Sequence, residues 1–175
     1  GLVDGITVDN SGNLYLGGYF KGDLIFDGNI ISQSVDYQSY FLMKIDPQGG
    51  LIWHRTGTKS GAVGLSWTDT GLLVMLTVSD SIIYNGTTYH HPAPTIPLTR
   101  DFVLLMLDGA GDYIWHKFLS GSKNEQIHHV AYNNGKCLIQ GRFEENLTYD
   151  GQTLMGSETG RLFQLSIQSL NGDFL

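Results

Sequence analysis

The chain has 175 residues, of which 41% are hydrophobic, 15% are charged and 23 are glycine. Average proteins have about 25% charged residues and about 7% glycine, so this composition predicts many turns and few long helices. The net charge of −7, without any cluster of basic residues, excludes the electrostatic pattern of a nucleic-acid-binding protein. No apolar run approaches the roughly 20 residues of a membrane-spanning helix. The single cysteine, Cys137, excludes an internal disulfide and a multi-cysteine metal cluster.

Three landmarks recur along the chain in the same order. An aromatic residue followed by Asp or Asn and then Gly occurs at 26–28, 84–86 and 149–151. One glycine precedes each tripeptide and another follows it, at positions Gly12, Gly71, Gly135, Gly49, Gly111 and Gly172. This periodicity predicts three repeats, over residues 1–59, 60–123 and 124–175.

Each repeat has a pattern of strands and turns. In the first repeat, alternating apolar residues predict strands at 6–8, 14–16, 41–45 and 51–54. Asp27-Gly28 lies between apolar runs, which is a strong signal for a tight hairpin. The third and fourth strands recur at 102–107, 113–116 and 162–167. No segment has a convincing helical periodicity.

Four antiparallel strands that recur about every 60 residues predict a β-propeller. Residues 102–107 are apolar at every position, which suits a strand packed on both faces. A stacked solenoid or a β-sandwich would also bury such a strand, but explains the repeated strand order less directly. The predicted fold is all-β, a propeller of about three four-stranded antiparallel blades.

The residues 6–20, 26–28 and 41–53 resemble the bacterial β-propeller repeat of the SBBP type. The resemblance covers the chain in three copies and is strongest in the first. In the second repeat Leu76 and Thr77 replace a glycine pair, and residues 90–97 are an insertion. The resemblance implies a propeller in a secreted or cell-surface bacterial protein, without shared catalytic residues.

Two tryptophans follow the turn glycines at the same spacing. Trp53 lies four residues after Gly49, and Trp115 lies four residues after Gly111. Both segments are similar to the tryptophan-docking motif of quinoprotein propellers, where the indole packs against the neighbouring blade and does not hold the cofactor. The resemblance therefore implies that Trp53 and Trp115 dock one blade on the next.

The number of repeats is too small for a closed propeller, because known propellers close with about 4 to 8 blades. We expect a partial propeller, the segment of a larger propeller domain. The alternative is half of a six-bladed ring, in which two copies assemble through their open sheet edges and faces.

The residues with chemical potential have simpler structural explanations. Adjacent histidines, at 90–91 and 128–129, point to opposite faces of a strand and do not chelate one metal ion. The turns at 9–13 and 108–112 are explained by Asx-turn chemistry without calcium. No Gly-x-Ser-x-Gly segment occurs, and Cys137 is expected to be a buried, inert thiol. We therefore predict no catalytic residue, no metal and no cofactor.

The loops between the hairpin and the third strand differ most in length among the repeats. Equivalent loops of a propeller emerge on one side, and variable loops on a rigid scaffold commonly carry function. The predicted ligand- or partner-binding residues in or beside them are Tyr37, Tyr40, Tyr89, His90, His91, Arg100 and Arg161.

The predicted function is a non-enzymatic module of an extracellular or cell-surface bacterial protein, either a structural scaffold or a protein-interaction surface. Its partner is another protein or the remaining blades, with no nucleic acid and no membrane insertion. Two alternatives stay open: part of a glycoside-active or quinoprotein propeller enzyme whose active residues lie in other blades, and a carbohydrate-binding module.

Overall fold

The computed structural model describes residues 1–58, 60–91, 101–121, 123, 125–149, 152–155, 160–173 and 175. Over these residues the chain is all-β, as predicted, and its sheets are antiparallel. The described residues form no helix, and hence none that could cross a membrane.

The first sheet contains four strands in sequence order, β1 (Leu2–Val8), β2 (Leu14–Phe26), β3 (Asn29–Ile45) and β4 (Leu51–Thr58). Between β1 and β2, Asp9 Oδ1 accepts hydrogen bonds from the backbone N–H groups of Ser11 and Asn13, both at 2.9 Å. This is the predicted Asx-turn. Between β2 and β3, Asp27 and Gly28 have φ values of 47° and 75°, as a two-residue hairpin turn requires.

The second sheet contains six strands. Four are from the second repeat, namely β5 (Ala62–Trp67), β6 (Leu72–Val78), β9 (Asp101–Leu107) and β10 (Tyr113–Gly121). The hairpin β13 (Asn146–Tyr149) and β14 (Gln152–Met155) adds to β10, with Leu119 opposite Tyr149. Residues 146–155 thus add two strands to a sheet whose other strands come from residues 62–121.

The remaining strands form two smaller sheets. The third sheet contains β11 (Gln126–Asn133), β12 (Lys136–Phe143) and β15 (Arg161–Gln168). The hairpin β7 (Ser81–Tyr84) and β8 (Thr87–His90) is a two-stranded sheet of its own. It lies against the first sheet, since the hydroxyl of Tyr40 donates a hydrogen bond to the carbonyl of Ile83 at 2.7 Å.

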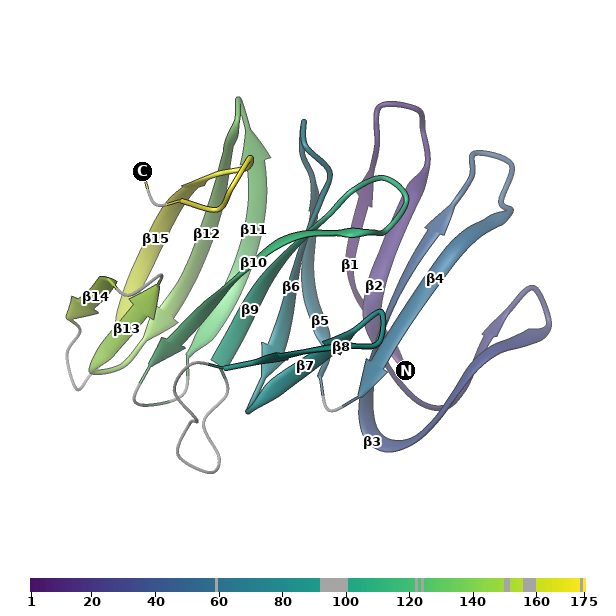
Figure 1. Cartoon of the computed structure of the whole chain (residues 1–175), viewed down its shortest axis with the longest axis horizontal. Coiled ribbons are helices and arrows are strands. Elements are labelled where there is room, and N and C mark those ends of the chain that lie inside the picture. Colours follow the sequence, from purple (N-terminus) through teal and green to yellow (C-terminus); the bar gives the residue numbers. More distant parts are fainter. Residues whose placement is uncertain are drawn as a thin grey trace.

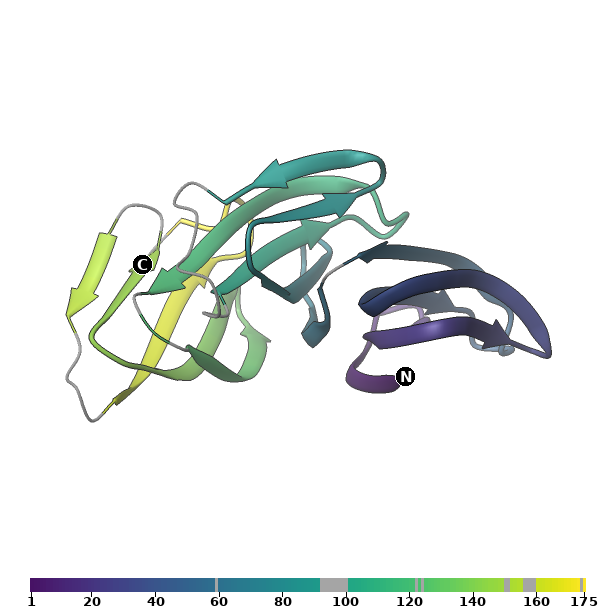
Figure 2. The ribbon, with the colours of Figure 1, turned by 90° about the horizontal axis from the view of Figure 1, so that it is seen from below.

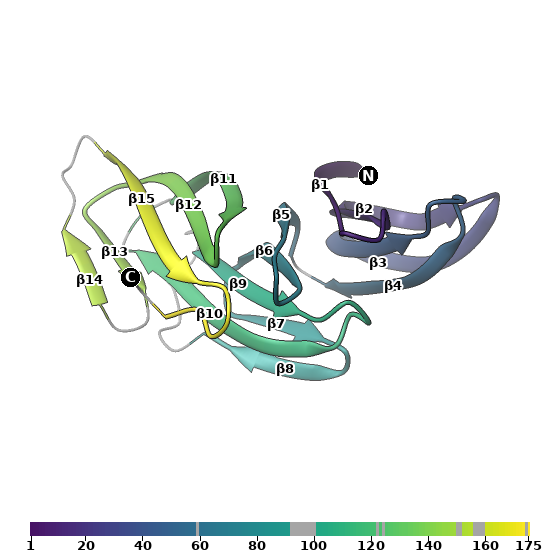
Figure 3. The ribbon, with the colours of Figure 1, turned by 90° about the horizontal axis from the view of Figure 1, so that it is seen from above.

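The three larger sheets stand side by side along the molecule (Figure 1). Viewed from above, β1, β5 and β11 lie next to one another near the centre, and the sheets spread outward from there (Figure 3). Seen from below, the first sheet forms one end of the array and the third repeat the other (Figure 2). Within the described residues the array is open, because no sheet closes on itself and the sheets form no ring.

Hydrophobic cores fill the two spaces between neighbouring sheets. One contains Tyr15 and Leu42 of the first sheet with Leu65 and Val74 of the second. The other joins the opposite face of the second sheet to the third sheet. Strand β9 lies between the two cores and is buried along its whole length, as predicted for residues 102–107.

The two tryptophans link neighbouring sheets in the same way. The indole N–H of Trp53 donates a hydrogen bond to the carbonyl of Gly109 at 3.3 Å, and a Cβ atom added to Gly111 would lie 3.1 Å from its ring. Trp115 donates to the carbonyl of Ser169 at 3.2 Å, and its ring lies against Gly172. Each tryptophan therefore packs on a glycine turn of the following sheet.

Candidate functional site

Five aromatic side chains from the β7–β8 hairpin and β10 form a continuous series, which we call the aromatic strip. Its members are Tyr89, His91, Tyr113, His116 and Phe118. The rings of Tyr89 and Tyr113 are stacked, with centroids 5.0 Å apart and planes 21° apart. Tyr89 also contacts His116 edge to face at 4.8 Å. The strip therefore joins residues about 25 positions apart in sequence through tertiary packing.

The strip runs from the surface into the core. Alternation along β10 places His116 and Phe118 on one face, with their ring centroids 5.3 Å apart. Phe118 then meets the edge of the His91 ring at 4.9 Å. Tyr113 is 39% exposed at the outer end, whereas His91 is only 6% exposed at the inner end. The outer rings are thus held by a chain of contacts that reaches a rigid core.

Two residues of the outer part of the strip, Tyr113 and His116, are uncharged near neutral pH. The hydroxyl of Tyr113 is hydrogen-bonded to Nδ1 of His116 at 2.9 Å. Burial, with a smaller contribution from Lys117, lowers the pKa of His116, so its imidazole is neutral near pH 7. Burial raises the pKa of Tyr113, and its phenol stays protonated. Aromatic faces with one polar edge suit ligands that are partly apolar and partly hydrogen-bonding.

A buried polar cluster lies at the inner end of the strip. His91 Nε2 is 3.6 Å from Asp101 Oδ2, and both side chains are fully buried. Asp101 Oδ1 accepts a hydrogen bond from the backbone N–H of Gly121 at 3.2 Å. Burial raises the pKa of Asp101. Burial, followed by the nearby charge of Asp101, raises the pKa of Glu125 to about 8.

This cluster has the features of a structural contact and not those of a catalytic site. Glu125 is protonated at neutral pH, since its pKa is raised to about 8, so the two carboxyl groups carry one negative charge at most. Because the side chains of His91 and Asp101 are closed to solvent, a substrate does not reach them. The two residues directly flank residues 92–100, and their contact brings the end of the β7–β8 hairpin next to the start of β9.

The predicted binding residues do not form one group. Tyr89, His90 and His91 lie together at the end of the β7–β8 hairpin, and His90 is exposed. Tyr40 is fully buried, so its hydrogen bond to Ile83 supports the packing of the hairpin and not ligand binding. Arg161 begins β15 in another sheet. Arg100 and the side chain of Tyr37 lie outside the described residues.

Sequence reasoning missed three members of the aromatic strip. Tyr113, His116 and Phe118 belong to β10, for which the sequence predicts a strand but no binding role. Their spacing puts 116 and 118 on one face, but nothing in the local pattern indicates that the β7–β8 hairpin covers that face. The strip depends on this tertiary placement.

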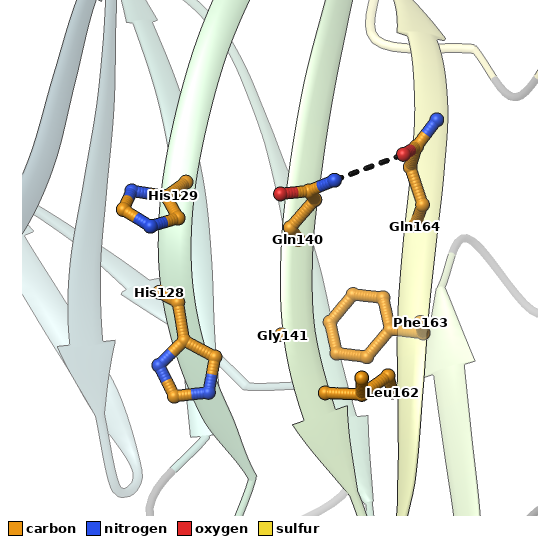
Figure 4. A pocket seen from close by; sticks show the side chains of 7 residues that line it. All are labelled: His128, His129, Gln140, Gly141, Leu162, Phe163 and Gln164. Carbon is orange, nitrogen blue, oxygen red and sulfur yellow. Dashed lines mark hydrogen bonds between the residues drawn. The ribbon is translucent and has the colours of Figure 1, made fainter.

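A hollow of about 470 Å³ lies on the outer side of the third sheet. Figure 4 shows its lining residues, which come from all three strands of that sheet. Gln140 Nε2 donates a hydrogen bond to Gln164 Oε1 at 3.0 Å. The described residues contain no group of three His, Cys, Asp or Glu side chains that could hold a metal ion.

Cys137 is fully buried, and burial raises the pKa of its thiol to about 12. It therefore stays a thiol at neutral pH and lacks the thiolate that nucleophilic catalysis needs.

A comparison of the chain with protein-family models finds no match, and a comparison with curated proteins also finds none.

Proposed function

We propose that the chain is a non-enzymatic β-propeller module whose three blades form a scaffold, and whose aromatic strip binds a protein partner. The stacked pair of Tyr89 and Tyr113 carries the binding proposal, because it presents rigid aromatic surface at an exposed position. The module belongs to an extracellular or cell-surface bacterial protein of the SBBP-repeat type that its sequence resembles.

The repeated contacts between the sheets support the propeller. Trp53 and Trp115 each reach the glycine turn of the next repeat, and the hydroxyls of Tyr84 and Tyr149 donate to the carbonyls of Gly111 and Gly172 at these same turns. Blades related by a rotation make the same contact at each junction, whereas the two sheets of a sandwich meet through a single interface.

Details within the sheets also support related blades. In the first sheet Gly18 lies opposite Phe41, and in the third Gly141 lies opposite Phe163. Both phenylalanines meet a second ring edge to face, with centroids 6.4 Å and 5.9 Å apart. The first and third repeats therefore build the same core arrangement in different sheets.

The anchoring of the aromatic strip supports binding. Aromatic side chains dominate the energetics of protein interfaces, because they bury a large area at low entropic cost. Tyr89 and Tyr113 are held by His116 and Phe118, so little side-chain motion is lost when a partner binds.

A selection of peptides from a random displayed library on the immobilised chain tests this proposal. We expect the selected peptides to bind at least about tenfold more weakly to Tyr113→Ala, which corresponds to about 1.4 kcal/mol. The control is Ile114→Ala, since Ile114 is the next residue on β10 and is 40% exposed. Peptides that bind Tyr113→Ala and Tyr89→Ala as well as the unaltered chain would show that the strip is not the binding surface.

Carbohydrate binding is a second candidate, which the same tyrosine pair favours because aromatic faces also stack on sugar rings. A glycan array probed with the unaltered chain and with Tyr113→Ala separates the two. Glycan binding that is lost in Tyr113→Ala, together with a failure to select peptides, would favour a carbohydrate-binding module.

A further inference from the structure

The first strand of each of the three larger sheets carries a row of side chains, which we call its ridge. In the second and third sheets the ridge faces the sheet that precedes it along the chain. In the first sheet this ridge consists of Val3, Ile6 and Val8, which pair with Gly18, Leu16 and Leu14. The register of the other first strands identifies the equivalent residues. They are Ala62, Leu65 and Trp67 in the second sheet, and Ile127, Val130 and Tyr132 in the third.

The second and third ridges pack against the preceding sheet. Leu65 lies at Gly5 and Gly17, which are paired with each other, and Cβ atoms added there would lie 2.9 Å and 3.1 Å from its side chain. Val130 similarly lies at Gly64, with a corresponding distance of 3.5 Å. Both ridges thus place an apolar side chain against a glycine of the neighbouring sheet. We call the position on the sheet that receives this side chain the slot.

The first ridge has no such cover in the described structure. Val3, Ile6 and Val8 are 56%, 64% and 53% exposed, whereas Leu65 is 7% exposed. Three adjacent exposed apolar side chains on one strand form a patch of the kind that marks an interaction surface.

The matching slot is open on the third sheet. The slot of the first sheet consists of Gly5, Gly17 and Leu42, and the register places His129, Gln140 and Gln164 at the equivalent positions. These three residues line the hollow of about 470 Å³, and Leu162, which is 82% exposed, lies at its side (Figure 4). The chain thus has an uncovered ridge on the first sheet and an unoccupied slot on the third. These are the two surfaces that meet at each junction between its own sheets.

We propose that a second copy of this chain docks head to tail, with Ile6 of one copy in the slot of the other. The proposal rests on the propeller arrangement proposed above, because that arrangement makes the contact equivalent to the internal junctions. If each copy places its ridge in the slot of the other, the two contacts together form a closed dimer. Both ridges are then buried. The two glutamines and the histidine make the slot more polar than its internal counterparts, as in interfaces that form reversibly.

Sedimentation analysis of the full chain, over about 1 µM to about 1 mM, spans the affinities of reversible association and tests the proposal. We expect the unaltered chain to change from monomer to dimer in this range. Ile6→Asp on the ridge, and Leu162→Asp at the slot, should each shift the transition at least tenfold to higher concentration. The control is Val35→Asp, since Val35 is 98% exposed on β3 and belongs to neither surface. Circular dichroism checks that each variant is folded.

Mixing the two variants tests the head-to-tail geometry. The Ile6→Asp chain keeps its slot and the Leu162→Asp chain keeps its ridge, so an equimolar mixture should recover a dimer held by one intact junction. A ridge-to-ridge dimer would be lost in Ile6→Asp alone and would not be recovered by mixing, which overturns the proposal. A chain that stays monomeric throughout, or dimers that both substitutions leave unchanged, also overturn it.

These outcomes are separate from those of the proposed binding function. The sedimentation experiment changes residues of β1 and β15, whereas peptide binding depends on the aromatic strip of β8 and β10. A monomeric chain that still binds peptides through Tyr113 would remove only the dimer, and a dimer without peptide binding would remove only the binding function.

Discussion

The indole N–H of Trp115 donates a hydrogen bond to the carbonyl oxygen of Ser169, 54 residues further along the chain. The indole is 8% exposed and also covers Gly172, where an added Cβ atom would lie 2.8 Å from the ring. A single side chain thus connects the last strand of one repeat to a turn of the next. The stability of the array is therefore expected to depend on such contacts more than on any one sheet.

Removal of the Trp115 ring tests this dependence. Trp115→Ala is expected to lower the free energy of unfolding by about 3–5 kcal/mol, because it leaves a cavity between two sheets and removes one of the two hydrogen bonds that the Ser169 carbonyl accepts. Urea denaturation measures the change. Tyr113→Ala, on the same strand but 39% exposed, is the control and should cost far less. Equal losses in the two variants would contradict a special role of the Trp115 contact.

Alanine substitutions at two turn glycines distinguish the cost of the backbone conformation from the cost of a clash with the tryptophan ring. Gly111 and Gly49 occupy equivalent turns and have φ values of 81° and 91°, but only Gly111 lies against a ring. Both alanine substitutions should cost about 1 kcal/mol for the left-handed conformation. Gly111→Ala should cost about 1–3 kcal/mol more, because its methyl group meets Trp53. Similar midpoints of urea unfolding for the two variants would show that the ring moves away freely.

The buried Glu125 predicts a stability that depends on pH. Its pKa is raised from 4.5 to about 8, so the folded chain keeps a proton that the unfolded chain has lost between these values. Stability should therefore fall as the pH rises from about 4.5 to about 8, by on the order of a few kcal/mol.

Thermal or urea unfolding at a series of pH values checks this, with Glu125→Gln as the comparison. The amide cannot ionise, so the variant should lose the Glu125 contribution, while the contributions of the histidines stay the same in both chains. Parallel pH profiles for the two proteins would contradict the raised pKa.

Cys137 should be unreactive in the folded chain. Its side chain is fully buried and burial raises its thiol pKa to about 12, so a thiol reagent at pH 8 meets almost no accessible thiolate. Labelling by such a reagent is expected to follow the unfolding curve in urea. Rapid labelling without denaturant would show that the core between the second and third sheets opens readily.

Local features of this fold follow from the order of residues. Asp9, Asp27 and Gly28 have side-chain or backbone preferences that determine their turns, and the first three residues of β2, 14–16, follow from alternating apolar residues. The continuous apolar run of β9 indicates burial on both faces. These predictions succeed because each depends on a few neighbouring residues.

The candidate site was predicted only in part. Tyr89, His90 and His91 are predicted because they lie in or beside a loop of variable length, whereas nothing in the local sequence distinguishes Tyr113 and His116 from other strand residues. Tyr40 was assigned to binding because it precedes a strand in a variable segment, yet it is fully buried. Local sequence does not indicate which neighbouring sheet will cover a side chain.

The glycine excess and the low charge of this sequence indicated by themselves a chain of strands joined by tight turns, and the apolar run of β9 indicated one strand buried on both faces. Tertiary structure alone decided that the β13–β14 hairpin pairs with β10, that the aromatic strip forms, and that Asp101 meets Glu125 in the core. Turn and strand preferences act over a few residues of backbone. Contacts between sheets depend on how large apolar surfaces exclude water together, and that is a property of the whole chain.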